Sequence, residues 1–169
     1  MRLTKRWLAI LMSVILCVSM MACAKKNDTD HGDDGEKAYS VTYNDVKLTL
    51  GANAENALEA LGEPNFSQEV FDCGEGNSRM CYRYASLTLY TMKNTDGKET
   101  IDQIEVNDDL VETDKGIAIG SSVTALEEAH GKPTTKADDE WIYTSGSYQL
   151  IFDVEDGKVD GIGLLRKTK

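Results

Sequence analysis

The sequence has little of what histidine and cysteine chemistry requires. Its 169 residues include two His and four Cys, which leaves few ligands for a metal site built from these residues. Positive charge is also scarce, with 18 Lys and Arg against 29 Asp and Glu and a net charge of −11. Nucleic-acid binding needs clustered Lys and Arg to neutralise phosphates, so this composition argues against a nucleic-acid partner. We find no catalytic constellation and expect no enzyme activity, no cofactor and no metal site.

A long apolar run stands at the N-terminus. Three basic residues within the first six positions precede the run Trp7–Ala22, which is the layout of a secretory signal peptide. A single uncleaved membrane span is the alternative, because the run is close to the lower length limit for one. The run ends in Ala22-Cys23, a small residue before a cysteine, and this end resembles the lipobox of bacterial lipoproteins.

The lipoprotein resemblance implies an anchored, extracytoplasmic protein. Residues 1–22 would be the signal peptide, and Cys23 would carry acyl chains such as palmitate and become the mature N-terminus. Lipobox sequences usually have Leu three residues before the cysteine, where this chain has Met20. The expected location is therefore the outer side of the cell membrane, with the chain held there by lipid.

Residues 23–37 follow the signal and contain no bulky apolar side chain. Such a segment cannot bury enough surface to offset its ordering entropy, so we predict a flexible acidic tether. Its Asp and Glu residues lack the spacing of an EF-hand calcium loop, because Gly32 and Tyr39 stand at the wrong positions. A solvated linker is favoured over a cation site.

The rest of the chain contains an internal duplication. Residues 51–64 and 120–133 match at five of fourteen positions with an offset of 69. The two prolines of the chain, Pro64 and Pro133, fall at the same place in this alignment. We therefore divide the folded part into repeat one, residues 38–109, and a connector with repeat two, residues 110–169.

Each copy begins with a short amphipathic helix. In copy one, apolar residues spaced i, i+3, i+4 and i+7 follow Asn53, a good N-cap, and Gly62 can end the helix. In copy two, Ser121 or Ser122 is the cap and Gly131 ends the helix. His130 takes the place of an apolar residue at the end of this helix, where we favour a structural role over a catalytic one.

Strand patterns surround each helix. We predict strands at 66–73, 79–92 and 100–107 in copy one and at 138–144, 147–155 and 158–165 in copy two. A further strand precedes each helix, at Val46–Leu50 and Gly116–Ile119. Asp96-Gly97 and Asp156-Gly157 mark the last hairpin turn of each copy, because Asp-Gly favours tight hairpins. The predicted fold class is α+β, with two tandem β-α-β-β-β repeats whose short helices pack on antiparallel sheet.

This pattern resembles the fold of β-lactamase inhibitor protein and of the outer-membrane assembly lipoprotein BamE. The resemblance rests on the glycine that opens each helix segment, the Gly-x-Pro turn and the Asp-Gly-Lys hairpins, and it covers about residues 40–166. It is strongest to uncharacterised two-repeat lipoproteins of Gram-positive anaerobes. The inhibitor family has two helices per repeat, whereas one is predicted here. The resemblance implies a protein-binding surface on the sheet and no enzyme activity, although fold alone does not fix function.

Cys73 and Cys81 flank a glycine-rich loop in copy one. In an exported protein two nearby cysteines usually pair, and we predict a disulfide that contributes about 2–3 kcal/mol. Two free thiols in an anaerobic setting are the alternative.

Aromatic residues give the best candidate contact surface. Within 79–92, the leucines have one parity and the tyrosines the other, and the two parities of a strand face opposite sides of a sheet. The predicted binding face holds Tyr82, Tyr84, Tyr90, Trp141 and Tyr143. Tyr and Trp on a sheet face fit a protein interface, with ordinary cross-strand packing as the alternative.

The function that these patterns favour is a membrane-anchored, non-enzymatic protein-binding module of the cell envelope. Its partners would be the membrane, reached through the N-terminal lipid, and an envelope or secreted protein. The alternative is a sensor of a small ligand or cation that uses the acidic loops.

Overall fold

Two antiparallel sheets and two short helices form the part of the chain that the computed structural model describes, residues 37–71 and 78–167. The predicted α+β class with antiparallel sheet is confirmed. The predicted signal peptide, the predicted lipidation site Cys23 and nearly all of the predicted tether lie outside the described residues.

A helix followed by four strands occurs twice along the chain. The first elements are β1 (Ser40–Tyr43), β2 (Val46–Thr49), α1 (Ala54–Leu61), β3 (Phe66–Phe71), β4 (Ser78–Arg83), β5 (Leu87–Lys93), β6 (Glu99–Val106) and β7 (Glu112–Thr113). They are followed by α2 (Val123–His130), β8 (Thr135–Lys136), β9 (Glu140–Ser145), β10 (Tyr148–Glu155) and β11 (Lys158–Arg166). We call α1 with β3–β6 the first unit and α2 with β8–β11 the second unit.

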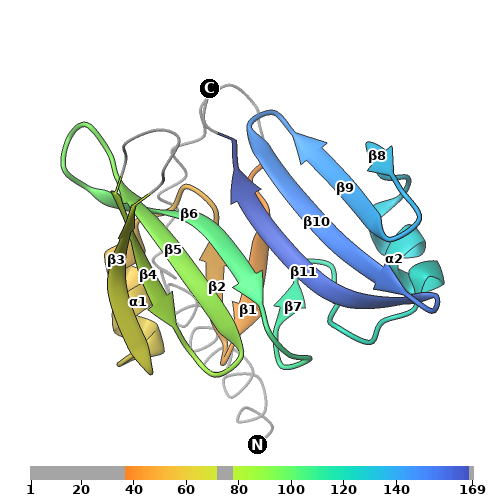
Figure 1. Cartoon of the computed structure of the whole chain (residues 1–169), viewed down its shortest axis with the longest axis horizontal. Coiled ribbons are helices and arrows are strands. Elements are labelled where there is room, and N and C mark those ends of the chain that lie inside the picture. The colour runs from red at the N-terminus through yellow and green to blue at the C-terminus, as the bar shows by residue number, and fades with distance from the viewer. Residues whose placement is uncertain (1–36, 72–77, 168–169) are drawn as a thin grey trace, which may run out of the picture.

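The two units share one eight-stranded sheet in the order β3-β4-β5-β6-β11-β10-β9-β8. They meet where β6 pairs with β11 and Ile104 lies opposite Leu164. This order leaves β3 and β8 as the two edge strands. Figure 1 shows α1 near the β3 end and α2 near the β8 end of this sheet. The remaining strands form a small sheet, β2-β1-β7.

Both helices and the small sheet lie on the same side of the large sheet, the far side in Figure 1. We call this side the covered face and the other side the open face. On the covered face, Val41 and Leu48 of the small sheet and Leu126 of α2 are fully buried in a single core. Large-sheet residues at alternate positions complete this core, among them Leu87, Leu89, Ile104, Leu150, Phe152, Ile162 and Leu164. Burial of this apolar area is the main stabilising contribution to the fold.

The helix ends follow the local sequence as predicted. The Asn53 side chain accepts a hydrogen bond from the backbone N–H of Glu55 at 2.8 Å, and Ser122 accepts one from Ala125 at 3.1 Å. Each helix ends at a glycine in the left-handed region, Gly62 at φ 75° and Gly131 at φ 76°. Such a backbone conformation suits glycine, which has no Cβ. Helices of eight residues are unstable alone, so docking on the sheet stabilises them.

The predicted strand 79–92 is wrong, because the chain turns sharply within it. β4 ends at Arg83 and β5 begins at Leu87, and the N–H of Tyr84 donates to the carbonyl of Leu87 at 2.8 Å. Four strands therefore follow α1, where three were predicted. Four also follow α2, because the two-residue strand β8 precedes β9.

The predicted strand Gly116–Ile119 is also wrong. Gly116 adopts φ 74°. The N–H of Thr113 donates to the carbonyl of Ile117 at 2.9 Å, and the N–H of Gly116 donates to the carbonyl of Thr113 at 2.9 Å. These bonds close a tight turn directly after β7, across the end of the predicted connector, residues 108–115. The predicted strand Val46–Leu50 is confirmed as β2, and it pairs with β1 across a turn in which Asn44 and Asp45 both have positive φ.

Candidate functional site

The predicted aromatic binding face is wrong for four of its five residues, and three of these four are buried. Tyr84, Trp141 and Tyr143 are only 6 %, 5 % and 6 % exposed and belong to the core. The register explains this burial for β9, since Trp141 lies opposite Phe152 and Tyr143 opposite Leu150. Directly opposite residues share a face, so both aromatic residues point to the covered face.

Tyr84 and Tyr143 hold the ends of the two helices. The Tyr84 hydroxyl donates to the carbonyl of Gly62 at 3.2 Å, and the Tyr143 hydroxyl donates to that of Gly131 at 3.0 Å. Each bond satisfies a carbonyl at a helix C-terminus that has no intrahelical donor. Burial raises the pKa of both tyrosines, so both hydroxyls stay protonated donors at neutral pH.

Tyr82 also lies on the covered face, because it stands opposite Leu89 in the β4–β5 register. Its hydroxyl donates to the Glu99 carboxylate at 3.1 Å. Burial and the charge of Glu99 raise the pKa of Tyr82 to about 12. The parity prediction failed for Tyr82 and Tyr84 because the turn between β4 and β5 separates them from the leucines, so their positions cannot be counted along one strand.

Tyr90 is the one residue of the predicted set that lies on the open face, where it stands opposite Cys81 and Gln103. Its hydroxyl donates to Glu105 at 3.4 Å, and the Arg79 guanidinium lies 5.6 Å from the centre of its ring. Burial is the largest cause of a raised pKa at Tyr90, and the negative charge of Glu105 is the second.

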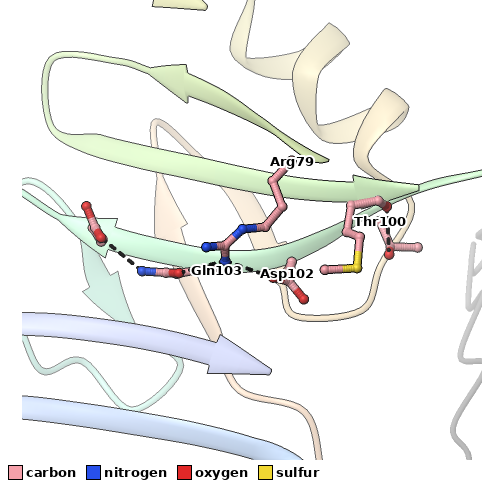
Figure 2. Close-up of polar contacts among 6 residues, drawn as sticks. Arg79, Thr100, Asp102 and Gln103 are labelled. Atoms are coloured by element: carbon pink, nitrogen blue, oxygen red, sulfur yellow. Dashed lines mark hydrogen bonds and ion pairs between the residues drawn. The ribbon is translucent and has the colours of Figure 1, made fainter. Parts of the chain in front are cut away.

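A polar network surrounds Tyr90 on the first unit. Arg79 donates to Asp102 at 3.3 Å and to the side-chain oxygen of Gln103 at 3.2 Å, and Gln103 donates to Glu105 at 2.9 Å (Figure 2). A bulge in β6 makes this possible. The register changes between Tyr90 and Thr91, so Asp102 is an extra residue in the β6 strand. Such bulges re-aim side chains.

The second unit presents a different open face. Ile142, Ile151 and Leu165 are partly exposed there, on β9, β10 and β11. Gly163 lies among them, opposite Ile151 on one side and Glu105 on the other. A Cβ added at Gly163 would meet only the Ile151 Cβ, at 4.0 Å, which is ordinary contact. The fold itself therefore has room for a side chain at this position. Sequence reasoning missed Gly163, although an isolated glycine in a strand pattern often marks a close backbone approach.

Gly161, two residues earlier, differs from Gly163. A Cβ there would come within 2.5 Å of the Asp153 carboxylate, so Gly161 makes room for a neighbouring side chain. The centre of the open face thus has two residues of β11 without side chains, Gly161 and Gly163, with apolar residues on one side and the polar network on the other.

Cys81 lies within β4, is 4 % exposed and forms no disulfide with any of the described residues. Cys73 and Cys23 lie outside the described residues, so the disulfide and the lipidation stay predictions. The acidic tether lies there too, apart from Lys37.

His130 packs within the second unit. Its ring lies 5.4 Å from those of Tyr143 and Phe152, and its Nε2 is 3.3 Å from the Thr113 hydroxyl. Burial and the charge of Lys115 lower the pKa of His130 to about 4, so the ring is neutral at pH 7. Across residues 37–71 and 78–167 no group of three or more His, Cys, Asp or Glu could hold a metal ion. No helix within these residues is long and apolar enough to cross a membrane.

Comparison with known proteins gives little. No family model matches the chain, and no curated protein matches it. Among solved structures, the crystal structure of a DUF4309 family protein (YjgB) from Bacillus subtilis is similar at 17 % identity with a TM-score of 0.39. The similarity covers 69 % of this chain and 79 % of that one.

Proposed function

We propose that this protein is a lipid-anchored, extracytoplasmic, non-enzymatic protein-binding module of the cell envelope. The anchor rests on the signal-like run Trp7–Ala22 and on Cys23 directly after it. Two or three acyl chains, each gaining about 0.8 kcal/mol per buried CH₂, would hold the chain stably at the membrane.

We further propose that the two units are tandem repeats of one ancestral element, a helix followed by four strands. Equivalent contacts in both units support this. The N–H of Gly51 donates to the carbonyl of Ile101 at 2.7 Å, and the N–H of Gly120 donates to that of Val159, also at 2.7 Å. The tyrosine-to-glycine hydrogen bonds at the helix ends are equivalent in the same way.

Gly163 carries the proposal that the open face binds a protein. Glycine within a strand costs about 0.5–1 kcal/mol relative to alanine, and at Gly163 no contact within the described residues requires it. The fold does not need a glycine at this position. The close approach of a partner's backbone or flat ring to the strand would explain why one stands there. The partner would meet Ile151 and Leu165 on one side and the Glu105 carboxylate on the other. This mixture of apolar, aromatic and polar groups is typical of a transient protein interface.

The test uses a photo-crosslinking residue at Leu165 in the full chain, expressed in intact cells. We expect it to capture a discrete protein partner. Gly163→Val should reduce that capture at least tenfold while leaving the melting temperature equal or higher, because valine favours strands. The control is Thr124→Val on the exposed side of α2, which should leave capture unchanged. Equal capture by the Gly163→Val chain, or no captured protein, would contradict the proposal.

The lipid anchor is tested separately, in the same cells. Cys23→Ala should yield an uncleaved or released chain with the sheet intact. A membrane-bound mature form with this substitution would rule out the lipid anchor and leave the open-face proposal standing.

A further inference from the structure

The two edges of the large sheet are built differently. β8 is two residues long, follows Pro133 closely and carries Lys136, whose ammonium lies 3.6 Å from the centre of the Trp141 ring. Short edge strands with lysine and a nearby proline are the usual protection against pairing with another chain. At this edge the sheet is therefore closed to further strands.

β3 has none of these protections. It is six residues long, its register with β4 runs unbroken from Phe66 to Phe71, and its one ionisable residue is Glu69. Both terminal phenylalanines are exposed, Phe66 by 44 % and Phe71 by 72 %. Within the described residues β3 pairs only with β4, so its outer backbone groups are available to a further strand.

We infer that β3 pairs with β3 of a second copy of this chain, antiparallel and across a two-fold axis perpendicular to the sheet. Such a pair continues the sheet through both copies and keeps the two open faces on the same side. Directly opposite residues in an antiparallel pair share a face, so the two-fold axis must pass beside a residue and not between two. Two registers pair five residues of each strand, one centred on Gln68 and the other on Glu69.

The side chains that each register brings together decide which of the two registers is favoured. Centring on Glu69 places two carboxylates directly opposite each other, which is destabilising. Centring on Gln68 instead places Phe66 of each copy opposite Val70 of the other. Aromatic and β-branched residues form a favourable cross-strand pair. The two Gln68 amides then meet at the axis, where each can donate to and accept from the other.

The self-complementary pattern is the reason to assign a second copy to this edge rather than a strand of another protein. The contact is one strand wide, far below the area of a standard stable interface, so association in free solution is weak. Anchoring both copies in one membrane would raise their effective concentration and favour the pair.

The test is light scattering on the full chain in mild detergent, from micromolar to several hundred micromolar. We expect the protein mass to rise toward twice that of one chain as the concentration increases. Gln68→Lys places two ammonium groups at the axis and should keep the mass at one chain throughout, and Gln68→Glu should do the same. An equimolar mixture of the two variants should recover the doubled mass, which a folding defect could not do.

Two controls fix the edge and the register. Thr135→Lys on β8 should leave dimerisation unchanged. Glu69→Lys should also leave it unchanged, because Glu69 lies opposite Ser67 in the register centred on Gln68. A native chain that stays single at every concentration, or a Gln68→Lys chain that still dimerises, would overturn the inference. Loss of dimerisation by Glu69→Lys alone would overturn the proposed register and, with it, the assigned pairing.

Discussion

The two units agree on the covered face and differ on the open face and at the edges. On the covered face each has a capped eight-residue helix, a glycine at its end and a tyrosine hydroxyl on that glycine's carbonyl. On the open face the first unit carries the Arg79 network, whereas the second is apolar around Gly163. The contacts that the two units share therefore build the fold. Binding is expected at the features that only one unit has.

The largest effect is expected from substitutions in the shared core. Phe152→Ala should lower the unfolding free energy by about 4 kcal/mol and Leu89→Ala by about 3 kcal/mol, because each leaves a cavity among fully buried residues. The Phe152 substitution should lower the unfolding free energy more than the Leu89 substitution, because Phe152 also contacts the rings of His130 and Tyr143. Since one core joins both units, each variant should unfold in a single denaturant transition. Two separate transitions would mean that the units fold independently.

A smaller, pH-dependent difference should come from His130, which stands where the first unit has Leu61. The pKa of His130 is lowered in the folded chain to about 4, from 6.5, so the unfolded chain binds more protons between these values. The contribution is therefore fully present above about pH 6.5 and is lost as the pH falls toward 4. We expect about 1–2 kcal/mol, discounted because the ring is partly solvated.

The measurement compares native and His130→Leu chains by urea unfolding between pH 4 and 7.5. The native chain should lose stability relative to the variant as the pH falls. Leu61→Val in the first unit is the control, and it should leave the pH dependence of the native chain unchanged. Parallel pH profiles for the native and His130→Leu chains would contradict the assigned burial of the imidazole.

The smallest effect tests the equivalence of the helix-end contacts. Tyr84→Phe and Tyr143→Phe each remove one hydroxyl donor and should each lower the unfolding free energy by about 1 kcal/mol. The two values should agree within about 0.5 kcal/mol, and thermal melts of the single and double variants would check this. Because the sites lie in different units, the effects should add. A cost for one tyrosine alone would break the equivalence of the two units.

Local chemistry made part of this fold predictable. Asn53, Gly62 and Gly131 mark helix boundaries through contacts within a few residues, and Asp156-Gly157 turns as predicted because both residues have positive φ. The strand β8 was not predictable, because two residues carry no periodicity. The turn at Tyr84 was missed since no glycine or proline marks it. That single omission placed Tyr82 and Tyr84 on the wrong face.

The candidate site was less predictable than the fold. Gly163 is visible in the sequence, but its role as a contact point is indicated by the free space beside Ile151. Only the strand register defines that space. The same holds for β3, whose position at an edge follows from the order of all eight strands. Tyr90 was the one predicted contact residue that the structure places on the open face.

The place of β1 has a mechanical consequence. β1 is the middle strand of the small sheet, bonded to β2 on one side and to β7 on the other, and it begins three residues after Lys37. A pulling force applied through the N-terminal residues would reach this strand first. Two hydrogen-bond ladders would share that load, and Val41, fully buried beneath the large sheet, would have to leave the core before the strand could be drawn out. The chain would thus resist tension at the end from which an anchored protein would be held.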